Sequence, residues 1–340
     1  MFKKKDNYRY EIFDCLRGVA IFLVFINHIP YNEYLLNEQT PIIIKNFFLS
    51  GTYGVQLFYI VSAATLLLSL TLRNEKNFKY FYLRRFFRIA PVFYIGILIH
   101  FLYYSIYGLY NLELLTFKNI LLNILFLNNI IPPSDDLILG GSTISTEMNF
   151  YLILPIIFLI VNTYKKSLIF SFVSLFLIVI VNSFSNFFFS GIYFGEINFY
   201  RTIFSQIYIF SLGVCFFEIH KNSFINFIEL NIKRTIYKIF PFIILAILMI
   251  IFGKQDPEFF YFKNMFLVST LFFILINIFF IIVKFITKNI FFKFFVNLGK
   301  ISFSMYILHW ITIHFSWELL KHLDYFRFYL IFFILFSFLL

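Results

Sequence analysis

Three polar side chains share one face of the first long apolar segment. Arg17 and His28 are eleven residues apart, which in an α-helix is about 16 Å along the axis and only about 20° around it. Asp14 precedes Arg17 by three residues, so it can pair with the guanidinium and lower the cost of a charge at membrane depth. We predict a functional stripe. The alternative is an arginine that snorkels to one headgroup layer and a histidine at the other.

Three arginines follow the second apolar segment. Arg85 and Arg88 are three residues apart and would share a helix face, with Arg84 beside them. Their guanidinium groups present planar forks that suit phosphate oxygens. We predict that this cluster binds the phosphates of a soluble donor, and anchoring to anionic lipid is the alternative.

A carboxylate, Glu147, stands where the sequence predicts the start of another apolar helix, directly after Ser145 and Thr146. An acid in the first turn complements the helix dipole, and this alone can explain it. The functional alternative is a carboxylate that orients or activates His28 or an incoming hydroxyl group.

A polar stripe also opens a later apolar segment, where Ser302, Tyr306 and His309 repeat at spacings of four and three. Such a repeat places the three side chains on one helix face. A histidine that faces the interior of a membrane bundle is a candidate functional residue, whereas polar contacts between helices are the alternative.

The elements that must position these residues are membrane helices. The 340 residues are 61% hydrophobic and 13% charged, with a mean hydropathy of +0.85, whereas about a quarter of residues are charged in soluble proteins. Apolar stretches long enough to cross a bilayer recur along the chain. We predict an all-α polytopic bundle, a single domain over residues 1–340, with about ten transmembrane helices near 11–29, 52–72, 89–108, 147–163, 167–186, 201–219, 239–252, 264–287, 301–317 and 327–340.

The stretch 118–131 is apolar but short, and it carries Asn123, Asn128 and Asn129. We therefore expect a re-entrant or interfacial segment rather than a crossing. With that choice, most Lys and Arg residues fall in segments on one side of the membrane, as the positive-inside rule requires. Both termini are then predicted to be cytoplasmic.

The remaining composition excludes other classes of function. The net charge of +11 is spread over the loops between spans rather than along a groove, so we expect no nucleic-acid partner. Cys15 and Cys215 both fall in apolar segments, which indicates buried thiols and no metal or redox centre.

The motifs, taken in order, resemble those of the membrane acyltransferase-3 family, transmembrane enzymes that acylate bacterial surface glycans. The most specific match is the run from Asp14 through Arg17 to His28, which is similar to the family's D-x-x-R-G-x-A pattern with its later histidine. Ser62 stands in a segment similar to the family's second-helix motif. The arginine cluster, the Glu147 segment and the segment 301–309 resemble three further family motifs.

The resemblance implies transfer of an acyl group, usually acetyl from acetyl-CoA in the cytoplasm, to a glycan hydroxyl across the cytoplasmic (inner) membrane, with no metal. It implies a donor site at Arg84, Arg85 and Arg88. Catalytic roles are implied for His28, Glu147, Arg17 and Asp14, with His28 as the base or a transiently acylated group. Further polar site candidates are Ser62, Ser302, Tyr306 and His309.

Two departures from the family pattern concern the packing near Glu147: Ala63 replaces a glycine after Ser62, and Ser142-Thr143 stand where Trp-Ser is usual. No fused extracytoplasmic esterase-like domain is expected, so the chain acts alone or passes the acyl group to a separate extracytoplasmic protein, with membrane lipid around it. The alternatives are a glycan-lipid flippase or transporter, and a glycan ligase that uses no acyl donor.

Overall fold

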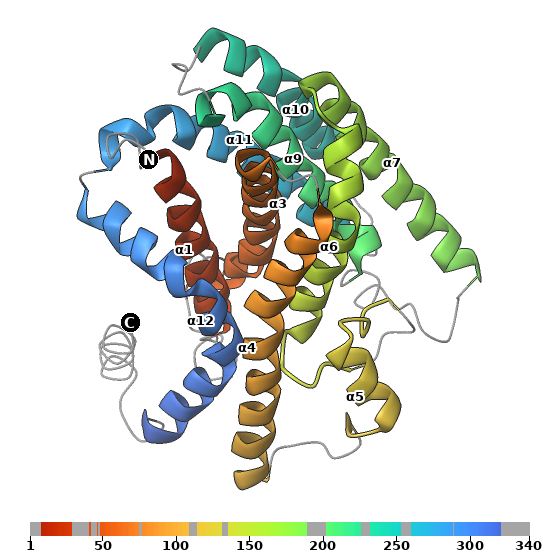
Figure 1. The fold of residues 1–340 in the computed structure, drawn as a ribbon, viewed down its shortest axis with the longest axis vertical. Coiled ribbons are helices and arrows are strands. Elements are labelled where there is room, and N and C mark those ends of the chain that lie inside the picture. The colour runs from red at the N-terminus through yellow and green to blue at the C-terminus, as the bar shows by residue number, and fades with distance from the viewer. Residues whose placement is uncertain are drawn as a thin grey trace.

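The computed structural model is all-helical over the residues it describes (Figure 1). These are residues 8–28, 41, 46, 48–74, 77–108, 114–130, 135–188, 202–225, 232–252, 260–287 and 289–320. Their helices are α1 Tyr8–His28, the 3-10 helix η3 Gly51–Tyr53, α3 Gly54–Arg73, α4 Phe78–Ile106, α5 Phe117–Ile124, α6 Gly141–Ile160, α7 Tyr164–Phe188, α9 Ile203–Ile225, α10 Ile232–Phe252, α11 Phe260–Ile286 and α12 Ile290–Leu320. The predicted all-α class is confirmed for this part of the chain.

Six helices in the described segments are long and apolar enough to cross a membrane, and they include α3, α4, α6 and α9. The α1 helix has 21 residues but carries Glu11, Asp14 and Arg17, whose charges reduce its hydropathy. The expected span 327–340 lies outside the described residues. The count of ten transmembrane helices therefore stays a prediction, whereas a multi-pass helical bundle is established.

Several helices begin before the spans that the sequence predicts, among them α4 and α6. The α4 helix begins at Phe78, where the side chain of Asn77 accepts a hydrogen bond from the Lys79 amide at 3.0 Å. The arginine cluster therefore lies inside α4 and not ahead of it. The α6 helix begins at Gly141, directly after Gly140 with φ of +82°. The prediction that Glu147 stands at the mouth of this helix is wrong, because Glu147 lies in its second turn and is buried.

Small residues let the central helices approach closely, as is common where bundles form in lipid. The most extensive contacts join α1 to α12, α3 to α9, α7 to α9 and α1 to α3. A Cβ atom on Gly18 would lie 2.0 Å from the Phe295 carbonyl oxygen, and one on Gly299 would lie 1.8 Å from that of Asp14. These two glycines set the crossing of α1 and α12.

The segment 117–130 does not form a crossing helix. The α5 helix has 8 residues, about 12 Å of helix against the roughly 30 Å of a hydrocarbon core. Figure 1 shows α5 beside one end of the bundle. The asparagines of the segment 117–130 are buried and form hydrogen bonds. Asn123 donates to the Asp135 carbonyl at 3.0 Å, and Asn129 donates to the Ser142 carbonyl at 3.1 Å and to the Thr146 hydroxyl. The residues that prevent a crossing therefore hold the segment against α6.

Candidate active site

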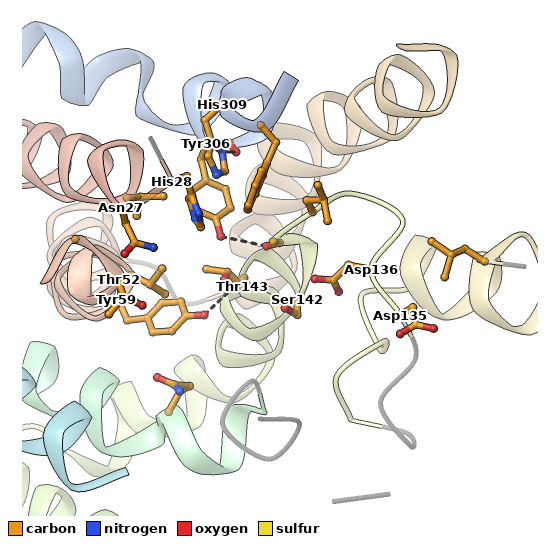
Figure 2. A pocket seen from close by; sticks show the side chains of 18 residues that line it. Asn27, His28, Thr52, Tyr59, Asp135, Asp136, Ser142, Thr143, Tyr306 and His309 are labelled. Carbon is orange, nitrogen blue, oxygen red and sulfur yellow. Dashed lines mark hydrogen bonds between the residues drawn. The ribbon is translucent and has the colours of Figure 1, made fainter. Parts of the chain in front are cut away.

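A cavity of about 600 Å³ opens at the C-terminal end of α1, the end predicted from the charge distribution to lie on the outer side. Figure 2 shows its wall built from α1, the start of α3, the loop before α6, and α12. A volume of this size is typical of a small-molecule site. The cavity is lined by Val24, Asn27, His28, Gly51, Thr52, Val55, Tyr59, Leu114, Asp135, Asp136, Leu139, Gly140, Ser142, Thr143, Gln206, Tyr306, His309 and Trp310. Of the predicted site residues, His28, Tyr306 and His309 meet here. We call this cavity the outer pocket.

Two histidines and a tryptophan form one wall of the outer pocket. The ring centroid of His28 lies 5.2 Å from that of His309 and 4.2 Å from that of Trp310. His309 is 2% exposed. Its Nδ1 lies 2.5 Å from the carbonyl oxygen of Tyr306, while its Nε2 has no hydrogen-bond partner. If Nδ1 carries the proton and donates to this carbonyl, Nε2 is a lone-pair acceptor.

Two tyrosines hold the start of α6 against the pocket wall. Tyr306 donates from its hydroxyl to the carbonyl of Gly140 at 3.1 Å, and Tyr59 donates to the carbonyl of Thr143 at 3.2 Å (Figure 2). Both bonds run between helices that are far apart in sequence. They fix the loop that carries Asp135 and Asp136 relative to the histidine wall.

Glu147 lies below the outer pocket and is 5% exposed. Its Oε1 accepts hydrogen bonds from the Ser62 hydroxyl and, at 2.5 Å, from the Tyr151 hydroxyl. These bonds join Glu147 to α3 and to its own helix and not to His28, so a role in orienting His28 or an incoming hydroxyl group stays a prediction. The carboxylate is held in place by two hydroxyl donors, one on a neighbouring helix and one on its own.

A smaller cavity, about 20 Å³, lies between Glu147 and the outer pocket. Its lining includes Glu147, Ser302 and Tyr306, and it shares Val24 and Thr143 with the outer pocket. Ser302 donates to the Gly299 carbonyl at 2.8 Å. The structure thus brings the predicted residues of α6 and α12 together around one small space.

Arg17 lies at the other side of Glu147, toward the N-terminal part of α1. One nitrogen of its guanidinium pairs with Asp14 at 3.3 Å, as the spacing predicted. Another donates to the Thr65 hydroxyl on α3 at 2.7 Å. Arg17 also interacts electrostatically with Glu147 and Arg88. The first-helix stripe therefore connects a charged cluster at one end with the histidine wall at the other.

Two of the three clustered arginines belong to this charged group. Arg85 is partly buried, reaches Ser69 on α3 at 3.5 Å, and interacts electrostatically with Arg17 and Arg88. Its Nε atom is buried and has no hydrogen-bond partner. Arg84 is exposed. Three guanidinium groups near one another, with one donor left over, can bind an anion.

One face of α3 runs past all of these groups. Tyr59, Ser62, Thr65 and Ser69 are spaced by three, three and four residues and contact, in turn, the outer pocket, Glu147, Arg17 and Arg85. Ten residues of helix span about 15 Å. Sequence reasoning identified Ser62 alone, although the spacing of hydroxyl side chains along an apolar helix was a usable signal. We call this set the α3 polar face.

Trp310, Asp135 and Asp136 are further pocket residues that the sequence analysis did not identify. Both carboxylates belong to a loop whose position depends on the contacts of α5 and α6, and no spacing rule points to them. Among the described residues, no group of three or more His, Cys, Asp or Glu side chains could hold a metal ion.

Fold and site together define a multi-pass helical membrane protein whose core contains a charged cluster, a buried carboxylate and a pocket with two histidines. A family model described as an acyltransferase domain matches residues 10–340, nearly the whole chain. The protein belongs to this family, acyltransferase-3, and is a membrane acyltransferase. No curated protein and no solved structure matched the chain.

Proposed function

We propose that this protein is an O-acyltransferase that moves an acyl group, most simply acetyl, from acyl-CoA on the cytoplasmic side of the inner membrane to a hydroxyl of a cell-surface glycan. The observation that carries the proposal is the α3 polar face, which joins the arginine cluster to the histidine wall through Glu147. Transfer of an acyl group across a membrane needs a donor site on one side, an acceptor site on the other and a path between the two sites.

The donor end is the arginine cluster. Coenzyme A carries phosphate groups, and Arg85 and Arg88 offer planar forks for their oxygens, with Arg17 behind them. The unpartnered Nε of Arg85 fits a role in anion binding. Asp14 and Thr65 hold the Arg17 guanidinium in place. With the acyl donor bound, these residues would position its phosphates and direct its acyl arm toward Glu147.

The acceptor end is the outer pocket. In the proposed reaction the imidazole of His28 takes the proton of the acceptor hydroxyl as that oxygen attacks the thioester carbonyl. The carbon–oxygen bond forms, the carbon–sulfur bond breaks, and the thiolate leaves and takes up the proton. Transient acylation of His28 is the two-step version of the same transfer. His309 lies beside His28, and its buried Nε2 has no hydrogen-bond partner.

The reacting groups must meet near the small cavity between Glu147 and the outer pocket. Its volume of about 20 Å³ is enough for about one water molecule. An acyl arm therefore enters only if lining side chains move, and the bulky ones there are Phe58, Phe303 and Tyr306. Glu147, held by Ser62 and Tyr151, lies along this path and can stabilise a neighbouring positive charge or position a donor hydroxyl.

Membrane vesicles that contain the protein and receive labelled acetyl-CoA on the cytoplasmic side test the proposal. We expect label on glycan with the unchanged protein and none with His28→Ala. Unlabelled glycan that crosses the membrane without acetylation would indicate a flippase, and glycan joined without use of acetyl-CoA would indicate a ligase. Label that persists with His28→Ala would remove His28 from the reaction. Label found first on a second protein would identify a separate acyl acceptor.

A further inference from the structure

We propose that the small cavity between Glu147 and the outer pocket limits the length of the acyl group, and that Phe58 on α3 and Phe303 on α12 set this limit at about two carbons. This inference rests on the proposed function and deepens it by naming acetyl-sized groups as the class transferred and the residues that exclude longer ones. The cavity is lined by side chains of α1, α3, α6 and α12, and each of them belongs to the described residues.

The lining matches the two parts of the acyl group of a thioester, which has a polar carbonyl and an apolar tail. Polar atoms come from Thr143, Glu147, Ser302 and Tyr306. The rest of the wall is apolar and consists of Ala20, Ile21, Val24, Val55, Phe58, Ile144 and Phe303. The volume of about 20 Å³ holds about one water-sized group. The methyl end of acetyl has that size, whereas the two further methylenes of butyryl find no room.

The cavity lies on the proposed route from the donor to His28. On the donor side, Phe58 stands one helical turn before Ser62 on the same face of α3, and Ser62 donates to Glu147. On the acceptor side, the cavity shares part of its lining with the outer pocket, namely Val24, Val55, Thr143 and Tyr306. An acyl group that moves from the arginine cluster along the α3 polar face therefore meets Phe58 before it reaches His28.

Phe58 and Phe303 are the side chains of this wall that restrict the space most simply. Both are half-buried and pack against the hydrophobic core, and a phenylalanine side chain has no polar atom. Tyr306, the third bulky side chain, is held by its hydrogen bond to the Gly140 carbonyl at 3.1 Å. Truncation of either phenylalanine therefore enlarges the cavity without breaking a side-chain hydrogen bond or changing a charge.

The aliphatic part of the wall has little freedom to yield. Ala20 is 1% exposed, and α1 and α3 touch beside it, since a Cβ on Gly54 would lie 2.5 Å from the Ala20 carbonyl oxygen. Protein interiors are closely packed, so volume added to them forces side chains and backbone to shift. A close-fitting apolar site discriminates against one methylene too many by about 10–200-fold. The native cavity should therefore reject butyryl.

Binding of acyl-CoA thioesters tests the limit without any acyl transfer. The protein in nanodiscs is titrated by calorimetry with coenzyme A, acetyl-CoA, propionyl-CoA and butyryl-CoA, which carry the same phosphates and differ in the acyl group. The variants are Phe303→Leu, Phe303→Ala and Phe58→Ala. Phe176→Ala is the matched control, because it removes the same atoms from a side chain of α7 that is 66% exposed and lines neither cavity.

We expect the unchanged protein to bind butyryl-CoA at least about tenfold more weakly than acetyl-CoA, with propionyl-CoA between them. The ratio should fall in Phe303→Leu and reach about one or less in the two alanine variants, because each methylene that gains an apolar space adds about fourfold in affinity. The Kd of coenzyme A itself should stay the same in every variant, which shows that the donor site is intact. Phe176→Ala should keep the native ratio.

Equal binding of acetyl-CoA and butyryl-CoA by the unchanged protein would overturn the inference, and so would a native ratio in the cavity variants that still bind coenzyme A. Phe303→Leu, which keeps most of the side-chain volume, decides the case if an alanine variant does not fold. No binding of any of the four compounds to the unchanged protein would overturn both proposals.

The vesicle assay with labelled acetyl-CoA is scored separately. If acetyl reaches glycan while the length preference is absent or does not respond to Phe58 and Phe303, the proposed function stands and this inference fails. If the preference is present and shifts in the variants while no acetyl reaches glycan, the cavity limits acyl length but the proposed transfer to glycan is wrong.

Discussion

At the scale of single residues, Thr65 connects the arginine cluster to α3. Its hydroxyl accepts from Arg17 at 2.7 Å and can donate to the Val61 carbonyl at 2.9 Å. Thr65→Val keeps the shape and removes a hydrogen bond to a charged group, which is worth about 1.5–3 kcal/mol. We expect kcat/KM for acetyl transfer to fall at least about tenfold, with Thr65→Ser close to the unchanged protein.

Thr71→Val is the matched control, because the Thr71 hydroxyl bonds only to the Leu67 carbonyl of its own helix, at 2.8 Å. Kinetics in membrane vesicles with varied acetyl-CoA check both variants. An equal loss in Thr65→Val and Thr71→Val would mean that helix stability, and not the position of Arg17, is what the measurement detects.

Arg85 tests the donor site. Arg85→Lys retains the charge but removes the planar fork, so we expect KM for acetyl-CoA to rise about tenfold with kcat changed less. Lys79→Ala, an exposed cation on the same helix, should leave KM nearly unchanged. A fall in kcat with constant KM for Arg85→Lys would contradict a role in donor binding.

Residue spacing predicted contacts within a helix and failed for contacts between helices. The pair of Asp14 and Arg17 is confirmed because three residues of helix bring the two side chains together. The contact of Arg17 with Thr65 depends on how α1 packs on α3, which no local pattern contains. Glu147 looked like a helix cap because the residues before it are polar, yet these residues are buried against α3 and Asn129 and belong to the helix.

At the scale of helices, the crossing of α1 and α12 depends on Gly18 and Gly299. Gly299→Ala places a Cβ 1.8 Å from the Asp14 carbonyl oxygen, so the helices must separate, at a cost of about 1–3 kcal/mol or more. We expect a lower Tm in detergent and, because Asp14 shifts, a weaker transfer activity. Gly141→Ala adds a Cβ no nearer than 3.7 Å to Phe93 and should retain the Tm. A retained Tm for Gly299→Ala would show that this packing contributes little.

The buried amides that hold 117–130 give a second prediction for a whole element. Asn129→Leu removes three buried hydrogen bonds, to the Ser142 carbonyl, to Thr146 and from the Asn149 amide, each worth about 0.5–1.5 kcal/mol net. Hydrogen exchange should accelerate in α5 and stay slow in α9. Asn162→Leu, at an exposed position, should change neither. Uniform acceleration over both helices would indicate general unfolding instead of release of this segment.

At the scale of the whole molecule, composition predicted the helical membrane class and hydropathy located the helices, but both are insensitive to their ends. Long helices such as α12, with 31 residues, extend beyond the apolar stretch 301–317 because their first turns pack on α1 through Gly299 and Phe295. The asparagines of 118–131 were informative, since a buried amide in lipid requires a partner, and the structure provides those partners in α6 and the loop before it.

The predicted orientation of the bundle depends on the same segment. If 117–130 does not cross, Phe117 lies outside and Lys165, at the start of α7, lies in the cytoplasm, where the positive-inside rule places basic loops. Both positions are exposed, and the native Cys15 and Cys215 are buried, so single introduced cysteines report against a low background. With a membrane-impermeant maleimide on spheroplasts, Phe117→Cys should react at once and Lys165→Cys only after permeabilisation. If both cysteines react in sealed spheroplasts, an additional crossing must lie between α4 and α6. Every later helix would then be inverted, and Arg85 and Lys165 would lie on opposite sides of the membrane.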